Sequence, residues 1–124
     1  MTMKDVSTTR VHCPVEVTLK LIGGKYKVMI LWNLVDQTLR FGELKRMIPL
    51  ITPKMLTQQL RELEEDGLIV RKTYAEVPPK VEYSLTKTGH SLYPILNNMY
   101  EWGTSYLETK GIKPNCNMKE SIRG

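Results

Sequence analysis

Residues 51–67 of this chain read ITPKMLTQQLRELEEDG and predict an amphipathic helix. At about 100° per residue, Leu56, Leu60 and Leu63 share one side of that helix, where they would face a core. The opposite side carries four donors at spacings of i, i+3, i+4 and i+7: Lys54, Thr57, Gln58 and Arg61. Side chains of these types hydrogen-bond to base edges and phosphates. A helix that buries one face and offers such donors on the other has the properties of a DNA recognition helix.

The ends of this helix are predicted by its capping residues. Thr52 is a favourable N-cap, Pro53 suits the first helical position, and Gly67 suits the left-handed position after the last turn. The free N–H groups of the first turn and the Thr52 hydroxyl would attract a phosphate. Acidic residues that would repel phosphates crowd the other end: Glu62, Glu64, Glu65 and Asp66. This polarity fits a helix whose first turns enter the major groove.

Three helices are predicted before residue 51. Pro14 begins the first, which Gly23 and Gly24 end. The second starts near Lys25 and is apolar on nearly all sides, which places it at the centre of the core. The third covers residues 41–48 and is joined to the recognition helix by a turn at Pro49, so that the two form a helix-turn-helix.

A β-hairpin and a long helix are predicted after residue 67. The strands cover residues 68–74 and 81–86, with a proline-containing loop between them, and residues 38–41 are expected to add a third small strand. The terminal helix follows, and Pro94 either kinks it or marks its true start. The fold class is therefore mainly α with a small β-hairpin (α+β), a winged helix-turn-helix.

We expect the folded domain to span residues 13–109, between a flexible arm (1–12) and a flexible tail (110–124). The terminal helix carries more apolar residues than one small domain can cover: Leu92, Ile95, Leu96, Met99, Trp102, Tyr106 and Leu107. This surplus predicts a homodimer whose interface is formed by the N- and C-terminal helices. The alternative is that the terminal helix packs wholly against the first two helices.

The hairpin carries the cations Arg71, Lys72 and Lys80. Cations on a wing can contact phosphates, and we favour this role for Arg71 and Lys80 more than for Lys72. Charge that protects an exposed strand edge is the alternative explanation. The formal net charge of +5 is compatible with double-stranded DNA as a partner but does not establish it.

Cys13 lies at the predicted N-cap of the first helix, a position that stabilises a thiolate over a thiol. It is the candidate for redox sensing, with a small buried side chain as the alternative. Cys116, in the predicted tail, is expected to be an incidental thiol.

The sequence predicts neither an enzyme nor a membrane protein. His12 and His90 have no evident partner, and the spacing of the cysteines fits no zinc site or disulfide framework. We therefore predict no catalytic residues, no metal and no cofactor. The chain has no apolar run as long as a membrane span and no signal peptide, which leads us to expect a cytoplasmic protein.

Five blocks of the sequence, which together extend over most of residues 13–107, resemble the HxlR-type winged-helix transcriptional regulators of bacteria and archaea. They are CPVE (13–16), LIGGK (21–25), RFGEL (40–44), ITPKMLTQQLREL (51–63) and VPPKVEYSLT (77–86). Family members often carry Trp where this chain has Tyr26. The resemblance implies a dimeric, cytoplasmic DNA-binding protein with an architecture similar to that of the MarR regulators. Several members sense electrophiles or oxidants through the cysteine that Cys13 matches.

These observations predict a sequence-specific transcriptional regulator, either a repressor or an activator. The resemblance adds a candidate response to oxidants or electrophiles at Cys13, and a small-molecule inducer is the alternative signal. Lys54, Thr57, Gln58 and Arg61 would lie in the major groove. Thr52 would contact a phosphate, and Arg71 and Lys80 the flanking backbone. The alternative function is a winged-helix module for protein interaction, but a protein-binding face would be more apolar than this one.

Overall fold

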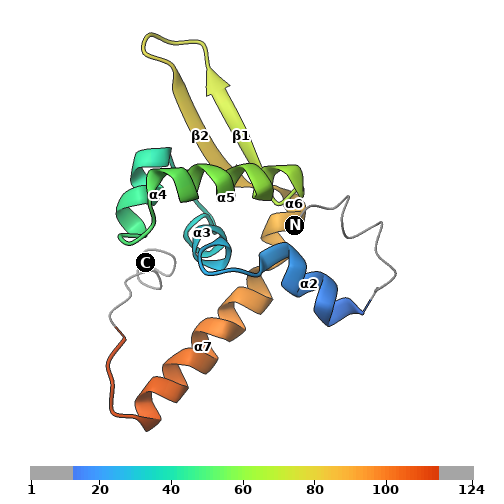
Figure 1. Cartoon of the computed structure of the whole chain (residues 1–124), viewed down its shortest axis with the longest axis vertical. Helices are drawn as coiled ribbons and strands as arrows, with labels where there is room; N and C mark the ends of the chain where they lie inside the picture. The colour runs from blue at the N-terminus through green and yellow to red at the C-terminus, as the bar shows by residue number, and fades with distance from the viewer. Residues whose placement is uncertain (1–12, 115–124) are drawn as a thin grey trace.

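The computed structural model describes residues 13–114, and its architecture is that of a winged helix-turn-helix (Figure 1). The elements in chain order are α2 (Pro14–Ile22), α3 (Lys27–Asn33), α4 (Phe41–Met47), α5 (Pro53–Glu65), β1 (Ile69–Tyr74), β2 (Lys80–Leu85), α6 (Lys87–His90) and α7 (Tyr93–Thr109). The predicted fold class is confirmed. The expectations for the arm, for His12, for Cys116 and for residues 115–124 lie outside the described residues, and the domain boundaries at 13 and 109 stay a prediction.

The core is built around α3, as its apolar composition predicts. Ile30 and Leu31 are fully buried there and are surrounded by apolar side chains of the neighbouring elements. These include Leu44, Ile48, Ile51, Leu56, Leu60, Leu63, Ile69 and Leu96. Leu56, Leu60 and Leu63 therefore form the buried face of α5, as their spacing predicts. The helix α3 begins at Lys27 rather than near Lys25, because the chain bends after Gly24, whose φ is 98°.

The wing is a two-stranded antiparallel sheet in which Ile69 pairs with Leu85 and Tyr74 with Lys80. The expected third strand at residues 38–41 is reduced to one bridge, between Leu39 and Tyr83. The pairing ends there because the Glu43 carboxylate accepts a hydrogen bond from the Arg40 N–H at 2.8 Å, and the chain turns into α4.

The base of the wing is fastened to the end of α5. Gly67 has a φ of 77°, as predicted for the residue after the helix, and its carbonyl accepts a hydrogen bond from Thr86 Oγ1 at 2.6 Å. Thr86 also accepts the Gly89 N–H at 3.0 Å. A Cβ atom at Gly89 would lie 2.0 Å from the Leu68 carbonyl oxygen, so only glycine permits this approach. These contacts fix the position of the wing relative to the recognition helix.

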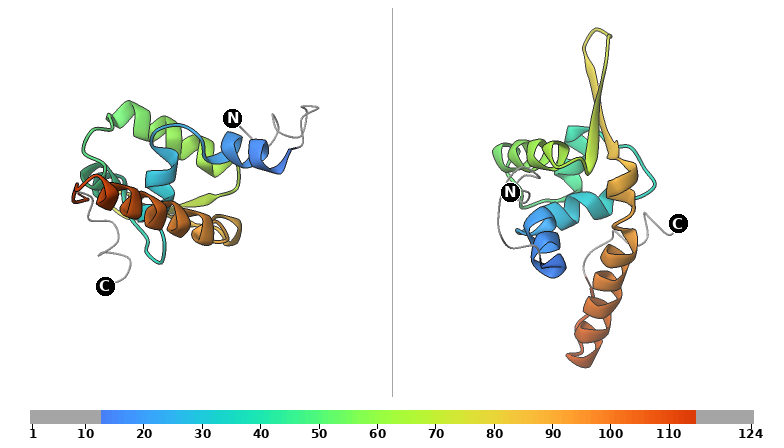
Figure 2. Two further views of the ribbon diagram at one scale, coloured as in Figure 1. Left: turned by 90° about the horizontal axis from the view of Figure 1, so that it is seen from below. Right: turned by 90° about the vertical axis from the view of Figure 1, so that its right-hand side faces the viewer.

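The terminal helix is interrupted. The short α6 ends at His90, and α7 begins at Tyr93 with Pro94 in its first turn, so Pro94 marks the true start of the long helix. The helix α7 extends away from the body of the molecule on the side opposite the wing (Figure 2). Among the helices of residues 13–114, none has the length and apolarity that crossing a bilayer requires.

Candidate nucleic-acid interface

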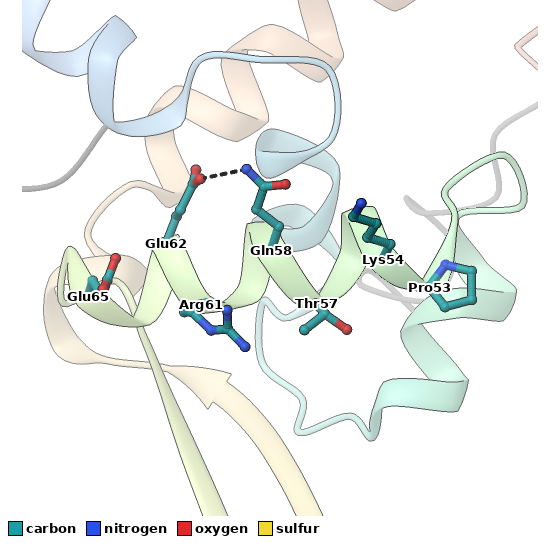
Figure 3. Close-up of a pocket in the computed structure, with 7 residues that line it drawn as sticks. All are labelled: Pro53, Lys54, Thr57, Gln58, Arg61, Glu62 and Glu65. Carbon is teal, nitrogen blue, oxygen red and sulfur yellow. Dashed lines mark hydrogen bonds between the residues drawn. The ribbon is translucent and has the colours of Figure 1, made fainter.

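The outer face of α5 presents the predicted donors to solvent. Lys54, Thr57, Gln58 and Arg61 are all exposed. Together with Pro53, Glu62 and Glu65 they line an open hollow along the helix (Figure 3). The structure therefore places the four donors on one continuous surface.

The N-terminal end of α5 is capped as predicted. Thr52 Oγ1 accepts a hydrogen bond from the Met55 N–H at 3.1 Å. The Thr52 carbonyl accepts the Leu56 N–H at 2.9 Å, and Pro53 has no N–H to satisfy. Because the Thr52 hydroxyl serves the cap as an acceptor, its own proton can be donated to an external anion.

The four acidic residues expected to repel phosphates at the end of α5 have different surroundings. Asp66 is buried, and Glu62 Oε1 lies 2.6 Å from the Nζ of Lys27, a lysine whose side chain is 5% exposed. The hydrogen bond from Lys27 holds the pKa of Glu62 below its usual value. Glu64 and Glu65 are exposed. Asp66 and Glu62 thus belong to the packed structure, and only Glu64 and Glu65 remain in a position to repel phosphates.

Gln58 is linked to this ion pair. Its Nε2 donates to Glu62 Oε2 at 3.2 Å, as the dashed line in Figure 3 marks. A candidate base reader on the outer face of α5 is therefore connected through Glu62 to a buried lysine at the start of α3.

Arg61 and Arg71 share a crevice between α5 and the wing, which is also lined by Thr57, Leu60, Glu64 and Tyr83. Figure 3 shows the Arg61 side chain leaving α5 on the side where the strands pass. The two arginines, one from α5 and one from β1, thus line the same crevice.

Lys80 is held at the far end of the wing. Its Nζ lies 3.4 Å from Glu82 Oε2 and 4.9 Å from the centre of the Tyr74 ring, on which Lys72 also rests at 5.0 Å. The hydrogen bond from the Tyr74 hydroxyl, followed by that from Lys80, lowers the pKa of Glu82. Lys80 therefore shares its charge with a carboxylate, unlike Arg71, for which no such ion pair is found within residues 13–114.

Cys13 is exposed at the N-cap of α2, so the alternative of a buried side chain is wrong. The prediction that His90 has no partner is also wrong, because its Nε2 lies 3.3 Å from Asp36 Oδ1. Asp36 takes a left-handed backbone conformation, with a φ of 58°, at the turn that follows α3.

An apolar groove of about 460 Å³ runs between α2 and the first turns of α7. Its lining includes Val15, Leu19, Ile22, Val28, Ile95 and Met99. Beyond the groove, Trp102 is 69% exposed and stacks on Tyr106 with a centroid distance of 5.3 Å. The terminal helix does not pack wholly against the first helices, and Trp102 and Tyr106 in its outer half are exposed.

Residues 21–111 match the HxlR-like helix-turn-helix family. The chain belongs to this family. It is 54% identical to the HTH-type transcriptional regulator YdeP of Bacillus subtilis (strain 168) over 94 residues, which are 76% of this chain and 73% of YdeP. As a member of this family of transcriptional regulators, this HxlR-like protein is a DNA-binding transcriptional regulator.

Solved structures agree with this assignment. The redox regulator HypR in its reduced form has a TM-score of 0.76 and 50% identity to this chain, covering 80% of this chain and 98% of HypR. The oxidised form of HypR has a TM-score of 0.73 and 55% identity, covering 75% and 96%. A MarR-family regulator from Porphyromonas gingivalis W83 has a TM-score of 0.74 and 41% identity, covering 77% and 94%.

The sequence does not predict the contacts of three residues near the candidate interface. Lys27 and Glu62 form an ion pair, and Tyr83 lines the crevice between α5 and the wing. The spacing of Gln58 and Glu62 by four residues could have predicted their hydrogen bond. Nothing in the sequence pairs Lys27 with Glu62, because that contact depends on how α3 crosses α5.

Proposed function

We propose that this HxlR-like regulator binds operator DNA as a homodimer, with α5 in the major groove and the wing against the flanking backbone. The observation that carries the proposal is the exposed donor face of α5, on which Lys54, Thr57, Gln58 and Arg61 line one hollow. Thr52 would donate to a phosphate at the N-terminal end of the helix, where the helix dipole adds to the attraction.

The roles proposed for the cations follow from their surroundings. Arg61 enters the major groove beside Thr57, and Arg71 from the same crevice contacts the adjoining phosphate. Lys80 would contact the DNA backbone farther along the wing. This contact would compete with the ion pair between Lys80 and Glu82. If Arg61 reads a base, Arg61→Ala weakens operator binding by about 1–3 kcal/mol.

The uncovered faces of α2 and α7 are proposed as the dimer interface. Val15 and Leu19 are 68% and 60% exposed on α2, beside a groove whose other wall is α7. An apolar surface of this kind is unfavourable in water unless another chain covers it. A two-fold axis through this region would leave two recognition helices free to contact successive turns of the DNA.

Cys13 is proposed as the site at which an oxidant or electrophile changes DNA binding. It is exposed at the N-terminus of α2, next to the proposed dimer interface, and the similar structures of HypR are titled as oxidised and reduced forms of a redox regulator. In a reaction with diamide, two thiols lose two electrons and two protons to the diazene and form a disulfide, either between subunits or with a small thiol. A small-molecule inducer is the alternative signal.

Binding to the DNA upstream of the protein's own gene, across a salt series, tests the function. Tight binding to this DNA, steeply weakened by salt and absent with random DNA of the same length, is the expected result. Equal binding to both DNAs at every salt concentration would contradict a specific regulator of this promoter.

The same titration with and without diamide tests Cys13. The wild-type protein should respond, and Cys13→Ser should not. A full response of Cys13→Ser would assign sensing to another group, whereas DNA binding that is insensitive in both proteins would favour a small-molecule signal.

A further inference from the structure

A chain of three polar side chains leads from the core to the DNA-facing surface of α5. Lys27, buried at the start of α3, is paired with Glu62 at 2.6 Å, and Glu62 accepts a hydrogen bond from Gln58 at 3.2 Å. Lys27 is inside the protein, Glu62 is partly exposed, and Gln58 is on the surface. The buried Lys27 therefore positions Glu62, and Glu62 in turn positions the amide of Gln58 on the surface.

The chemistry of Glu62 determines which end of the Gln58 amide faces it. An ionised carboxylate can only accept hydrogen bonds, and the contact with Lys27 keeps Glu62 ionised at neutral pH. The Nε2 group of Gln58 must therefore face Glu62. The Oε1 atom points the other way, toward the N-terminal part of the helix (Figure 3).

We infer that Glu62, anchored by Lys27, is a specificity-determining positioning residue that makes Gln58 present its carbonyl oxygen to the major groove. The inference rests on the proposed role of Gln58 as a base reader. An oxygen left free by the contact with Glu62 accepts from the exocyclic amine of adenine or cytosine and is repelled by the carbonyl oxygen of guanine or thymine. The second Nε2 hydrogen remains for the N7 of adenine, which makes adenine the preferred base.

Without Glu62 the amide of Gln58 could rotate by half a turn and offer its NH₂ group instead. That group would suit the acceptors of guanine and thymine. The contribution of Glu62 is therefore a restriction on which bases are accepted. Its loss should relax specificity at one base pair while the affinity for the best site changes little.

The test is selection of binding sites from a pool of DNA duplexes with a randomised centre, followed by titrations. Gln58→Ala identifies the base pair that Gln58 reads. The double variant Lys27→Met/Glu62→Leu removes the carboxylate without leaving a buried, unpaired lysine. Glu65→Leu is the control for base preference alone: it removes a carboxylate from the same hollow, which can raise affinity by reducing phosphate repulsion, but it lies outside the Lys27–Glu62–Gln58 chain.

At the base pair identified by Gln58→Ala, the wild-type protein and Glu65→Leu should prefer A·T over G·C, on whichever strand the adenine lies, by about tenfold. The double variant should reduce this preference to about twofold and leave the other positions unchanged. Thermal unfolding shows whether the double variant is folded. If it is not, Lys27→Met alone, in which Glu62 can turn toward water, should lower the same preference by several fold.

Three results would overturn the inference and leave the regulator function intact. They are a wild-type preference for G·C at that base pair, an unchanged preference in the folded double variant, or no position that depends on Gln58. If the wild-type protein selects no sequence at all, the proposed function fails and the inference fails with it.

Discussion

Replacement of Thr52 separates the stability of α5 from its contact with DNA. Among residues 13–114, this side chain makes one hydrogen bond, in which it accepts the Met55 N–H at 3.1 Å. Two other positions at this end do not depend on the Thr52 hydroxyl. The Leu56 N–H donates to the Thr52 carbonyl at 2.9 Å, and Pro53 has no N–H. One capping bond is therefore lost in Thr52→Ala, and the expected loss of unfolding free energy is about 1 kcal/mol. For a domain of this size that corresponds to a fall in Tm of about 4 °C.

Thr52→Ser and Thr52→Asp complete the set. Serine keeps both the acceptor and the hydroxyl proton, so stability and DNA binding should stay close to wild type. Aspartate keeps the acceptor and adds a charge that the helix dipole favours, so its Tm should equal or exceed that of wild type. The same charge would face the proposed phosphate, and the Kd for operator DNA should rise by about tenfold.

The assays are thermal unfolding at one fixed protein concentration, because dimerisation shifts Tm, and operator titration at one fixed salt concentration. An unchanged Tm for Thr52→Ala would refute the capping argument. Wild-type affinity for Thr52→Asp would refute the phosphate contact, even if the capping argument holds.

Three further predictions follow from single contacts. Gly89→Ala should lower the unfolding free energy by about 1–3 kcal/mol, because its Cβ would lie 2.0 Å from the Leu68 carbonyl oxygen. Gly103→Ala is the control: its Cβ would have no neighbouring atom within 4 Å, so the variant should be neutral or stabilised by about 0.5–1 kcal/mol. Chemical denaturation measures both. The pKa of Glu62 is lowered on folding, so its stabilising effect should be present above pH 4.5, its unfolded value, and be lost as the pH falls through the folded value. Urea unfolding at a series of pH values should show that the unfolding free energy of Lys27→Met depends less on pH than that of the wild-type protein. Arg71→Ala should reduce the salt slope of operator binding by about 1. Lys72→Ala should leave the slope unchanged, because Lys72 follows Arg71 on β1 and its side chain lies on the opposite face of the strand from the α5 crevice.

The parts of the fold that the sequence predicts are those governed by local rules. The period of Leu56, Leu60 and Leu63 identifies the buried face of α5, and Thr52 and Gly67 identify its two ends. In each case the determining residues lie within a few positions of one another. The exposed donor face follows from the same period, because side chains opposite a buried stripe must face solvent.

The parts that the sequence does not predict depend on contacts between distant segments. The bond between His90 and Asp36 joins residues 54 positions apart in the chain, and the third strand fails because α4 begins immediately after the bridge at Leu39. Cys13 is ambiguous for a similar reason. A cysteine before a helix can be buried or exposed, and only the placement of α2 decides that it is exposed.

The acidic end of α5 shows how such a contact changes the meaning of a local pattern. From the sequence alone, four carboxylates act together as a region that repels phosphates. In the structure Asp66 is buried and Glu62 is paired with Lys27, whereas the other two carboxylates are exposed. Four residues that look alike in the sequence therefore have two different roles. Because Glu62 also accepts a hydrogen bond from Gln58, its proposed contribution to base selection passes through that side chain. Relatives with the same donors on this helix but without the Lys27 and Glu62 pair should therefore differ from this protein in which bases they accept more than in how tightly they bind.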